Sequence, residues 1–277
     1  VNYGGDNLLS VRADAREAEG WFYEGGGIYR HAYLLVTARE HVESLFVHSR
    51  VDMEKESAEV SVETELPGEW EICHGMTVRV HLTAPDGTEG RWKELKVPMP
   101  ERKEEEDGFT LLGVRKLTTV FRLEKPVLWE LENPALYLAT AVLCVNGEEK
   151  DRMTVRFGIR DIRFDAERGF LLNGKAVKLK GACCHQNHGG LGTALPDEIY
   201  RYRIRKLKQM GANSYRTAHY PPSPAFLDIC DEEGMLVMDE TRLLSSEKGD
   251  LEQLETMVKR DRNHPCVILY SLGNEEA

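Results

Sequence analysis

The stretch NSYRTAHYPPSPAFLDICDEEGMLVMDE, residues 213–240, alternates between extended and helical patterns and decides the fold. Residues 212–218 are predicted to form a strand, and residues 223–234 a helix that ends at Gly234. The apolar run at 235–240 is predicted to form the next strand. A strand that is joined to the next strand by a helix is the building unit of a parallel sheet.

The same alternation continues on both sides of this stretch. An apolar strand is predicted over 176–184, and a helix follows the pair Pro196-Asp197. Further on, residues 250–262 have helical spacing, and the nearly continuous apolar run at 266–275 is typical of a strand that is buried on both faces. Four strands that alternate with helices in this way predict half of an eight-fold (β/α) barrel.

Residues before about 165 show a different pattern. Segments such as 57–66, 76–85 and 135–145 alternate apolar and polar residues with a period of two, as half-buried strands do. Turn residues separate these segments, and none of them has the spacing of a long helix. Several short strands in succession predict an antiparallel β-sandwich.

Composition narrows the class of protein. The chain of 277 residues is 41% hydrophobic and 30% charged, and its net charge of −11 argues against a nucleic-acid partner. No apolar run approaches the about 20 residues that a membrane span needs. The six scattered cysteines do not resemble a disulfide framework, and free buried thiols favour a cytoplasmic, bacterial-type location. Because the chain begins at Val1 rather than Met, the sequence does not decide whether the protein is secreted.

Polar side chains follow each of the four predicted parallel strands. In a (β/α) barrel the carboxyl ends of the strands form the rim of the active site. Carboxylates, an amide, imidazoles and a guanidinium on one rim suit a polyhydroxylated ligand and proton transfer. In strand order these residues are His185, Asn187 and His188; Arg216, His219 and Tyr220; Asp239 and Glu240; and Asn274, Glu275 and Glu276, of which Glu276 is expected to have no role.

Each of these residues also has a structural interpretation when it is taken alone. An Asn-Glu pair at a strand end can cap a helix or form a surface ion pair, and single histidines are more often packed or capping. For His188 the two interpretations are balanced. A zinc site built from Cys183, Cys184, His185 and His188 is disfavoured, because adjacent residues of a strand point to opposite faces.

Five blocks of the sequence occur in the order of one known family. Residues 213–240 match the pattern Asn-x-x-Arg-x-x-His-Tyr-Pro followed by a helix and Asp-Glu, and RDRNHPCVILYSLGNE (260–275) matches a pattern that ends in Asn-Glu. The other blocks are GWFYEGGGIYRHAYL (20–34), KPVLWELENPALY (125–137) and VRFGIRDI (155–162). Together they resemble glycoside hydrolase family 2, which includes β-galactosidases, β-glucuronidases and β-mannosidases.

The resemblance implies a multidomain chain. Residues 1–38 would be the C-terminal end of a jelly-roll sugar-binding domain, and residues 39–162 an immunoglobulin-like β-sandwich. Residues 163–277 would be the N-terminal half of a (β/α)8 TIM barrel, the catalytic domain. Half a barrel leaves strand edges unpaired, so the chain on its own is expected to associate.

The resemblance also implies a retaining β-glycosidase that works by double displacement. Glu275 is then the general acid/base, and Asn274 hydrogen-bonds the 2-hydroxyl of the sugar. His185 and His219 contact sugar hydroxyls in the first subsite, and Arg216 orients the nucleophile. In this family the nucleophile is a Glu of the seventh barrel strand, so it is expected beyond the end of this chain, which alone should lack turnover.

Further expectations concern metals and neighbouring carboxylates. Asp239 and Glu240 are expected to brace the rim rather than to touch the substrate. Some β-galactosidases of the family bind magnesium through a Glu and a His shortly after the third strand, but here residues 241–246 offer Leu244 and Ser246. We therefore expect no metal and no other cofactor.

Three blocks bear on the identity of the sugar. HQNHGGLGTALPD (185–197) and SLGNEE (271–276) are most similar to bacterial β-galactosidases, whereas NSYRTAHYP (213–221) is shared with β-glucuronidases. A β-galactosidase is the first hypothesis and a β-glucuronidase the alternative within the family; a non-catalytic carbohydrate-binding or structural module is the alternative from another class. The expected partner is a β-linked oligosaccharide or glycoside, with no nucleic acid and no membrane, and a homo-oligomer is compatible with the family.

Overall fold

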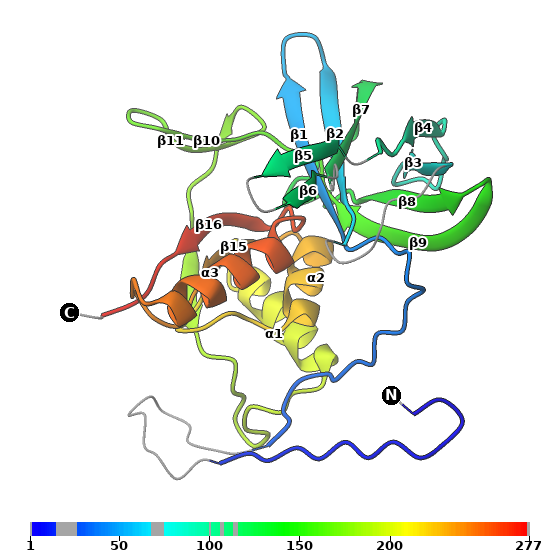
Figure 1. The fold of residues 1–277 in the computed structure, drawn as a ribbon. Helices are drawn as coiled ribbons and strands as arrows, with labels where there is room; N and C mark the ends of the chain where they lie inside the picture. Colours follow the sequence, from blue (N-terminus) through cyan, green and yellow to red (C-terminus); the bar gives the residue numbers. More distant parts are fainter. Residues whose placement is uncertain are drawn as a thin grey trace.

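The computed structural model describes residues 2–14, 27–67, 75–99, 101–105, 108–112 and 116–275. These residues form two hydrophobic cores, one in a β-sandwich and one around a parallel sheet with its helices (Figure 1). Their helices have at most 14 residues, too short for an apolar membrane span.

The predicted jelly-roll segment, residues 1–38, is only partly described. Residues 2–14 and 27–38 form no helix or strand, and residues 3–5 make a turn. Cys73 and residues 15–26 lie outside the described residues. The jelly-roll assignment therefore stays a prediction, as do the domain boundaries at 38 and 162.

The sandwich consists of two antiparallel sheets with the strand orders β1-β2-β7 and β4-β3-β8-β9. Their strands are β1 (Ser44–Asp52), β2 (Ser57–Glu65), β3 (Met76–Thr83), β4 (Lys93–Lys96), β7 (Lys116–Glu124), β8 (Tyr137–Val145) and β9 (Glu148–Phe157). A separate hairpin consists of β5 (Glu101–Glu105) and β6 (Gly108–Leu112). The strands predicted at 57–66, 76–85 and 135–145 are confirmed by β2, β3 and β8.

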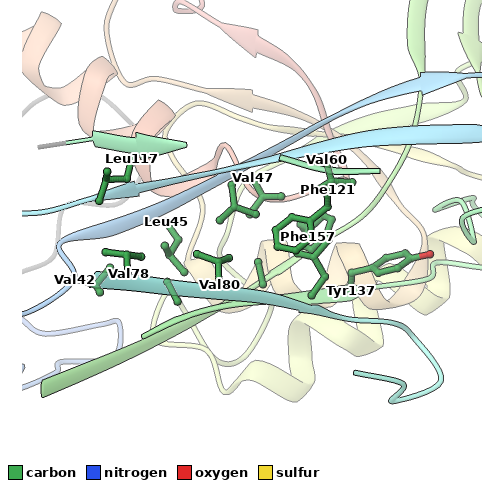
Figure 2. Close-up of a cluster of buried hydrophobic side chains, with 14 of the residues drawn as sticks. Val42, Leu45, Val47, Val60, Val78, Val80, Leu117, Phe121, Tyr137 and Phe157 are labelled. Atoms are coloured by element: carbon green, nitrogen blue, oxygen red, sulfur yellow. The ribbon is translucent and has the colours of Figure 1, made fainter. Parts of the chain in front are cut away.

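The period of two in the sequence produces the core between these sheets. In β7, Leu117 and Phe121 are buried, while their neighbours in the chain are exposed. Val78 and Val80 of β3 are fully buried from the opposite sheet. Figure 2 shows these side chains meeting between the two layers, with Phe157 beside Phe121. Burial of this apolar surface holds the two sheets together.

A small antiparallel sheet follows the sandwich and corrects one prediction. It consists of β10 (Ile162–Asp165), β11 (Gly169–Leu172) and β12 (Lys175–Ala176). The strand predicted over 176–184 is confirmed for residues 181–184, which form β13, but β12 ends at Ala176 and residues 177–180 form no strand. The chain reverses before β12, at Asn173-Gly174, whose φ angles are 49° and 74°. An Asn-Gly turn with both φ values positive is the geometry of a tight hairpin, so β12 pairs back onto β11.

The second half of the chain is a parallel sheet with the strand order β13-β14-β15-β16. Its strands are β13 (Gly181–Cys184), β14 (Ser214–Thr217), β15 (Leu236–Glu240) and β16 (Val267–Ser271). The connecting helices α1 (Asp197–Gln209), α2 (Pro224–Glu233) and α3 (Lys248–Asp261) lie together beside the sheet in Figure 1. This order confirms the predicted alternation of strands and helices.

The last strand is shorter than predicted. β16 ends at Ser271, whereas the apolar run had suggested a strand up to residue 275. Ser271 pairs with Glu240, which is the last residue of β15, so the residues after Ser271 have no partner on that strand. Asn274 and Glu275 therefore lie in the segment after the strand, at the carboxyl edge of the sheet.

Two side chains fasten the sandwich to the second core. Trp129 is fully buried, and its indole N–H donates to the carbonyl of Asp231 in α2 at 3.0 Å. Asn263, in the loop before β16, accepts the N–H of Val47 at 2.9 Å and donates to the carbonyl of Leu45 at 2.8 Å. Its amide thus pairs with the edge of β1 as another strand would, which fixes the sheet relative to the sandwich.

Candidate active site

Glu240, at the carboxyl end of β15, is the centre of a hydrogen-bonded cluster. Its side chain is fully buried, and its oxygens accept bonds from Arg216 Nε at 2.5 Å and Arg216 Nη2 at 3.0 Å. They also accept bonds from His219 Nδ1 at 3.0 Å and from the Ser271 hydroxyl at 2.9 Å. Its backbone N–H donates to Thr217 Oγ1 at 3.0 Å. Glu240 therefore joins the ends of three neighbouring strands, β14, β15 and β16, as the expected bracing role requires.

Arg216 connects this cluster to the predicted acid/base segment. Its Nη2 donates to Asn274 Oδ1 at 2.8 Å, and its Nη1 lies 3.7 Å from Cys183 Sγ on β13. The hydrogen bonds to Glu240 raise the pKa of Arg216 above its usual value, so the guanidinium is charged at every working pH. Because 26% of the side chain is exposed, the guanidinium also faces the rim, where an anionic group can approach it.

The two imidazoles lie edge to face at the ends of β13 and β14. The ring centroids of His185 and His219 are 5.1 Å apart with an interplanar angle of 81°. Donation from His219 Nδ1 to Glu240 selects the tautomer with its proton on Nδ1. Burial, and the nearby positive charge of Arg203, lower the pKa of His185, so its ring is neutral at neutral pH. A neutral imidazole both donates and accepts, which suits sugar hydroxyls.

Glu275 follows Asn274 in the segment after β16, and its side chain is exposed. The bond from Arg216 to Asn274 fixes the start of this segment on the rim. The structure thus brings His219, Arg216 and Asn274 into one cluster, and the ring of His185 lies edge to face with that of His219. The acid/base role of Glu275 stays a prediction.

The remaining residues after β13 have structural contacts. His188 donates its backbone N–H to Gly192 at 2.9 Å, and its ring lies 6.2 Å from that of Tyr202 on α1. Cys183 faces Arg216, whereas Cys184 packs against the core on the helix side of the sheet. The two thiols therefore point to opposite faces, as the argument against a zinc site requires.

Asp239 points away from the rim, towards α3. It is fully buried, as is Asp261, and no donor among the described residues meets the Asp239 oxygens. A hydrogen bond between these two carboxyls therefore needs a proton on one of them, and Arg260 already donates to both oxygens of Asp261, at 2.6 and 2.7 Å. Burial, and then the charge of Asp261, raises the pKa of Asp239 to about 8. Asp239 is thus a protonated residue of the scaffold that faces α3, and the rim is braced by Glu240.

The raised pKa of Asp239 predicts how the free energy of unfolding depends on pH. An unfolded Asp loses its proton near pH 4, so between about pH 4 and pH 8 the folded chain binds one proton more than the unfolded chain. The free energy of unfolding should therefore fall as the pH rises through this window, by up to about 1.4 kcal/mol per pH unit from this group. Asp239→Asn should remove that slope and make the protein more stable than the wild type at pH 8.

Urea unfolding between pH 5 and pH 9 measures this difference between variant and wild type. Glu252→Gln, on the exposed side of α3, is the matched control and should keep the wild-type slope. An Asp239→Asn variant with an unchanged slope would show that Asp239 carries no proton in the folded chain.

Ser271 and Thr217 were not among the predicted site residues, although both bond to Glu240. Neither residue stands out by type or spacing in the chain. The register of the sheet, in which Glu240 pairs with Ser271, brings the Ser271 hydroxyl to the carboxylate, whereas the Thr217 hydroxyl accepts the backbone N–H of Glu240.

The rim can bind hydroxyl groups and hold an anionic carboxylate beside Arg216, and it presents an exposed carboxyl at Glu275. The Glu and His that bind magnesium in some β-galactosidases of the family have no counterpart here, because residues 241–246 contain no carboxylate and no imidazole. Leu244 of this stretch is 56% exposed and offers no ligand atom from its side chain.

Comparison with family models covers both halves of the chain. Residues 40–160 match the model described as glycosyl hydrolases family 2, and residues 165–248 and 245–277 match the model of the TIM barrel domain of that family. The chain belongs to glycosyl hydrolase family 2. The order of sandwich and barrel domain in family 2 is the order of the two cores described above.

Related proteins and solved structures are similar to nearly the whole of this chain. The β-galactosidase BoGH2A of Bacteroides ovatus is 32% identical over 97% of this chain and 32% of its own length. A family 2 structure from Bacteroides cellulosilyticus superposes with a TM-score of 0.81 at 33% identity, over 95% of this chain and 36% of that one. The apo structure of β-glucuronidase 3 from Bacteroides uniformis superposes with a TM-score of 0.75 at 31% identity, over 92% of this chain and 30% of that one. The chain thus spans about a third of the length of these relatives.

Proposed function

We propose that this family 2 chain supplies the acid/base side of the active site of a retaining β-glycoside hydrolase. The observation that carries the proposal is the cluster in which Glu240 and Arg216 tie Asn274 to the ends of β14 and β15. It fixes the residue next to Glu275 on the rim where barrel enzymes bind their substrates. A family 2 relative of this chain is named a β-galactosidase, which supports a glycosidase activity.

In the proposed reaction, Glu275 donates a proton to the departing glycosidic oxygen and then removes one from the attacking water. A Glu of a barrel strand that this chain does not contain acts as the nucleophile, about 5–5.5 Å from Glu275. Arg216 faces the rim with a permanent charge and orients that nucleophile. Asn274 donates from its amide nitrogen to the sugar 2-hydroxyl, because its oxygen already accepts from Arg216.

The favoured substrate is a β-galactoside of a small molecule or an oligosaccharide. Neutral His185 and tautomer-fixed His219 would bind hydroxyls of the sugar in the first subsite. A β-glucuronide is the second candidate, since the solved relative from Bacteroides uniformis is a β-glucuronidase. The described cysteines are all free thiols, which supports a reducing, cytoplasmic location.

The stereochemistry of the first product tests the mechanism. The complete gene product, including the remaining barrel strands, should release the β-anomer first from an aryl β-galactoside, because two inversions restore the configuration. Proton NMR of the anomeric signal, recorded before mutarotation, distinguishes the two anomers. Release of the α-anomer first would exclude the double displacement, and the same assay with an aryl β-glucuronide separates the two candidate substrates.

A further inference from the structure

The loops that carry the two candidate sugar-binding histidines have little regular structure of their own. His185 begins the loop between β13 and α1, and His219 lies in the loop between β14 and α2. Loops of this kind keep a fixed shape only where other groups satisfy their backbone carbonyls. The groups that do so determine how far apart the two imidazoles lie.

One of these groups comes from within the barrel half. Arg203 of α1 donates from Nη2 to the carbonyl of His185 at 2.6 Å, and from Nη1 to the carbonyls of Gln186 at 2.9 Å and Asn187 at 3.3 Å. A second bond from Nη2 reaches the Tyr215 hydroxyl at 3.3 Å. Arg203 therefore anchors the first loop to its own helix and to β14.

The other group comes from the far end of the chain. Arg30 donates from Nη2 to Gln186 Oε1 at 2.7 Å in the first loop, and to the Pro221 carbonyl at 2.7 Å in the second. Its Nη1 donates to the Pro222 carbonyl at 3.3 Å. One rigid guanidinium thus bonds to both loops at once, across 191 residues of sequence in the case of Pro221.

The surroundings of Arg30 strengthen this contact. His31 lies 3.0 Å from both carboxylate oxygens of Asp197, the first residue of α1. The two loops also meet directly, where the N–H of Gln186 donates to the Tyr220 hydroxyl at 3.3 Å. In Figure 1 the blue N-terminal segment passes the yellow-green loop that follows β13 before it rises to β1.

We propose that Arg30 is a positioning residue for the sugar site, which it organises by holding the two histidine-bearing loops at a fixed separation. The inference rests on the proposed glycosidase function. It means that a segment on the N-terminal side of the sandwich shapes the first subsite of a barrel that begins more than a hundred residues later. The hydrogen bonds that the structure describes for Arg30 go to Gln186 and the two proline carbonyls, so Arg30 acts on the substrate through the loops.

Hydrogen exchange of this chain, read by mass spectrometry, tests the contact without any substrate. Arg30→Ala should speed amide exchange about tenfold in residues 185–195 and 219–223, since a charged hydrogen-bond donor to both loops is lost. Exchange in β8 and β15 should not change. Arg39→Ala, an exposed arginine of the same segment, is the matched control and should leave both loops as they are. Unchanged loop exchange in Arg30→Ala would overturn the proposal.

Kinetics of the complete gene product test the consequence for the sugar site. Arg30→Ala should raise KM for the aryl glycoside about tenfold or more and change kcat less, because the histidines bind the sugar in both ground and transition states. The pH profile should keep its shape, and Arg30→Lys should restore part of the affinity. A wild-type enzyme that turns over no β-glycoside would refute the proposed function and leave the exchange result standing; wild-type KM in Arg30→Ala would refute the positioning role alone.

A second variant covers the case in which Arg30→Ala fails to fold. Gln186→Leu removes the acceptor in the first loop and keeps the bonds from Arg30 to both prolines. Exchange should then rise in residues 185–195 and stay unchanged in 219–223. If both loops exchange in Gln186→Leu at their wild-type rates, Arg30 does not hold the first loop through Gln186, and the proposal is contradicted.

Discussion

Glu275→Gln in the complete gene product is expected to slow the hydrolysis of alkyl β-galactosides by about 10²- to 10⁴-fold, the range of a lost general acid. An alkoxide is a poor leaving group and needs the proton that Glu275 supplies. An activated aryl galactoside departs as a stable phenolate, so its glycosylation step should slow far less. The ratio of kcat/KM values for the two substrate classes, in variant and wild type, measures this difference.

The control for this experiment is Glu247→Gln, an exposed carboxylate at the residue before α3. It changes the charge near the sheet by the same amount and should leave both substrates unaffected. Equal losses for alkyl and aryl substrates in Glu275→Gln would contradict an acid role and would indicate that the carboxylate acts by binding or folding. The amide keeps the size of the side chain, so the test isolates the proton.

The sequence predicted the architecture well because hydrophobic periodicity reports burial directly. The period of two in β3 and β8 and the helical spacing in α1 each follow from one buried face, which a single segment displays on its own. The helix end at Gly234 was also predictable, since its φ of 66° favours glycine and a Cβ there would lie 2.2 Å from the Leu131 carbonyl. The ends of β12 and β16 could not be predicted, because they depend on pairing with other strands. β12 pairs with β11 after a turn, and β16 ends where its partner β15 ends.

The residues of the site could be predicted from the sequence, whereas the hydrogen bonds between them could not. Strand ends of a parallel sheet meet at one edge, so Arg216, His219 and Asn274 could be grouped from topology alone. Their bonds depend on side-chain directions and on register, and the bonds of Arg30 join segments that only the folded chain brings together. No periodicity marks a side chain that bonds to a distant carbonyl.

The stretch 260–275 illustrates that a recognisable motif need not be catalytic throughout. Arg260 and Asp261 form an ion pair beneath Asp239, and Asn263 pairs with the edge of β1. His264 lies 2.6 Å from Asp231 of α2, and burial of this pair is offset by the carboxylate, which raises the pKa of the imidazole. Most of the stretch therefore sets the position of β16, and the chemistry is left to its last two residues.

Glu240→Gln is expected to destabilise the parallel sheet by about 3 kcal/mol, near the lower end for removal of one partner from a buried ion pair. The Gln side chain fits the same space but presents an NH2 group to the donors of Arg216, His219 or Ser271. Because 26% of Arg216 is exposed, water can solvate part of the stranded charge, which keeps the loss at the lower end. About 3 kcal/mol corresponds to roughly a hundredfold faster opening of the sheet, since 1.4 kcal/mol is about tenfold.

Native-state hydrogen exchange measures this opening locally, which matters because the two cores need not unfold together. Amides of β14, β15 and β16 should lose about two decades of protection in Glu240→Gln, while those of β2 and β8 in the sandwich keep theirs. Glu59→Gln, which loses a pair with Arg122 at 3.9 Å on the surface of the sandwich, should change protection by less than tenfold, as exposed pairs contribute at most about 1 kcal/mol. Wild-type protection in β15 of Glu240→Gln would mean that the strand ends are held by the sheet alone, and the cluster around Glu240 would then serve the ligand rather than the fold.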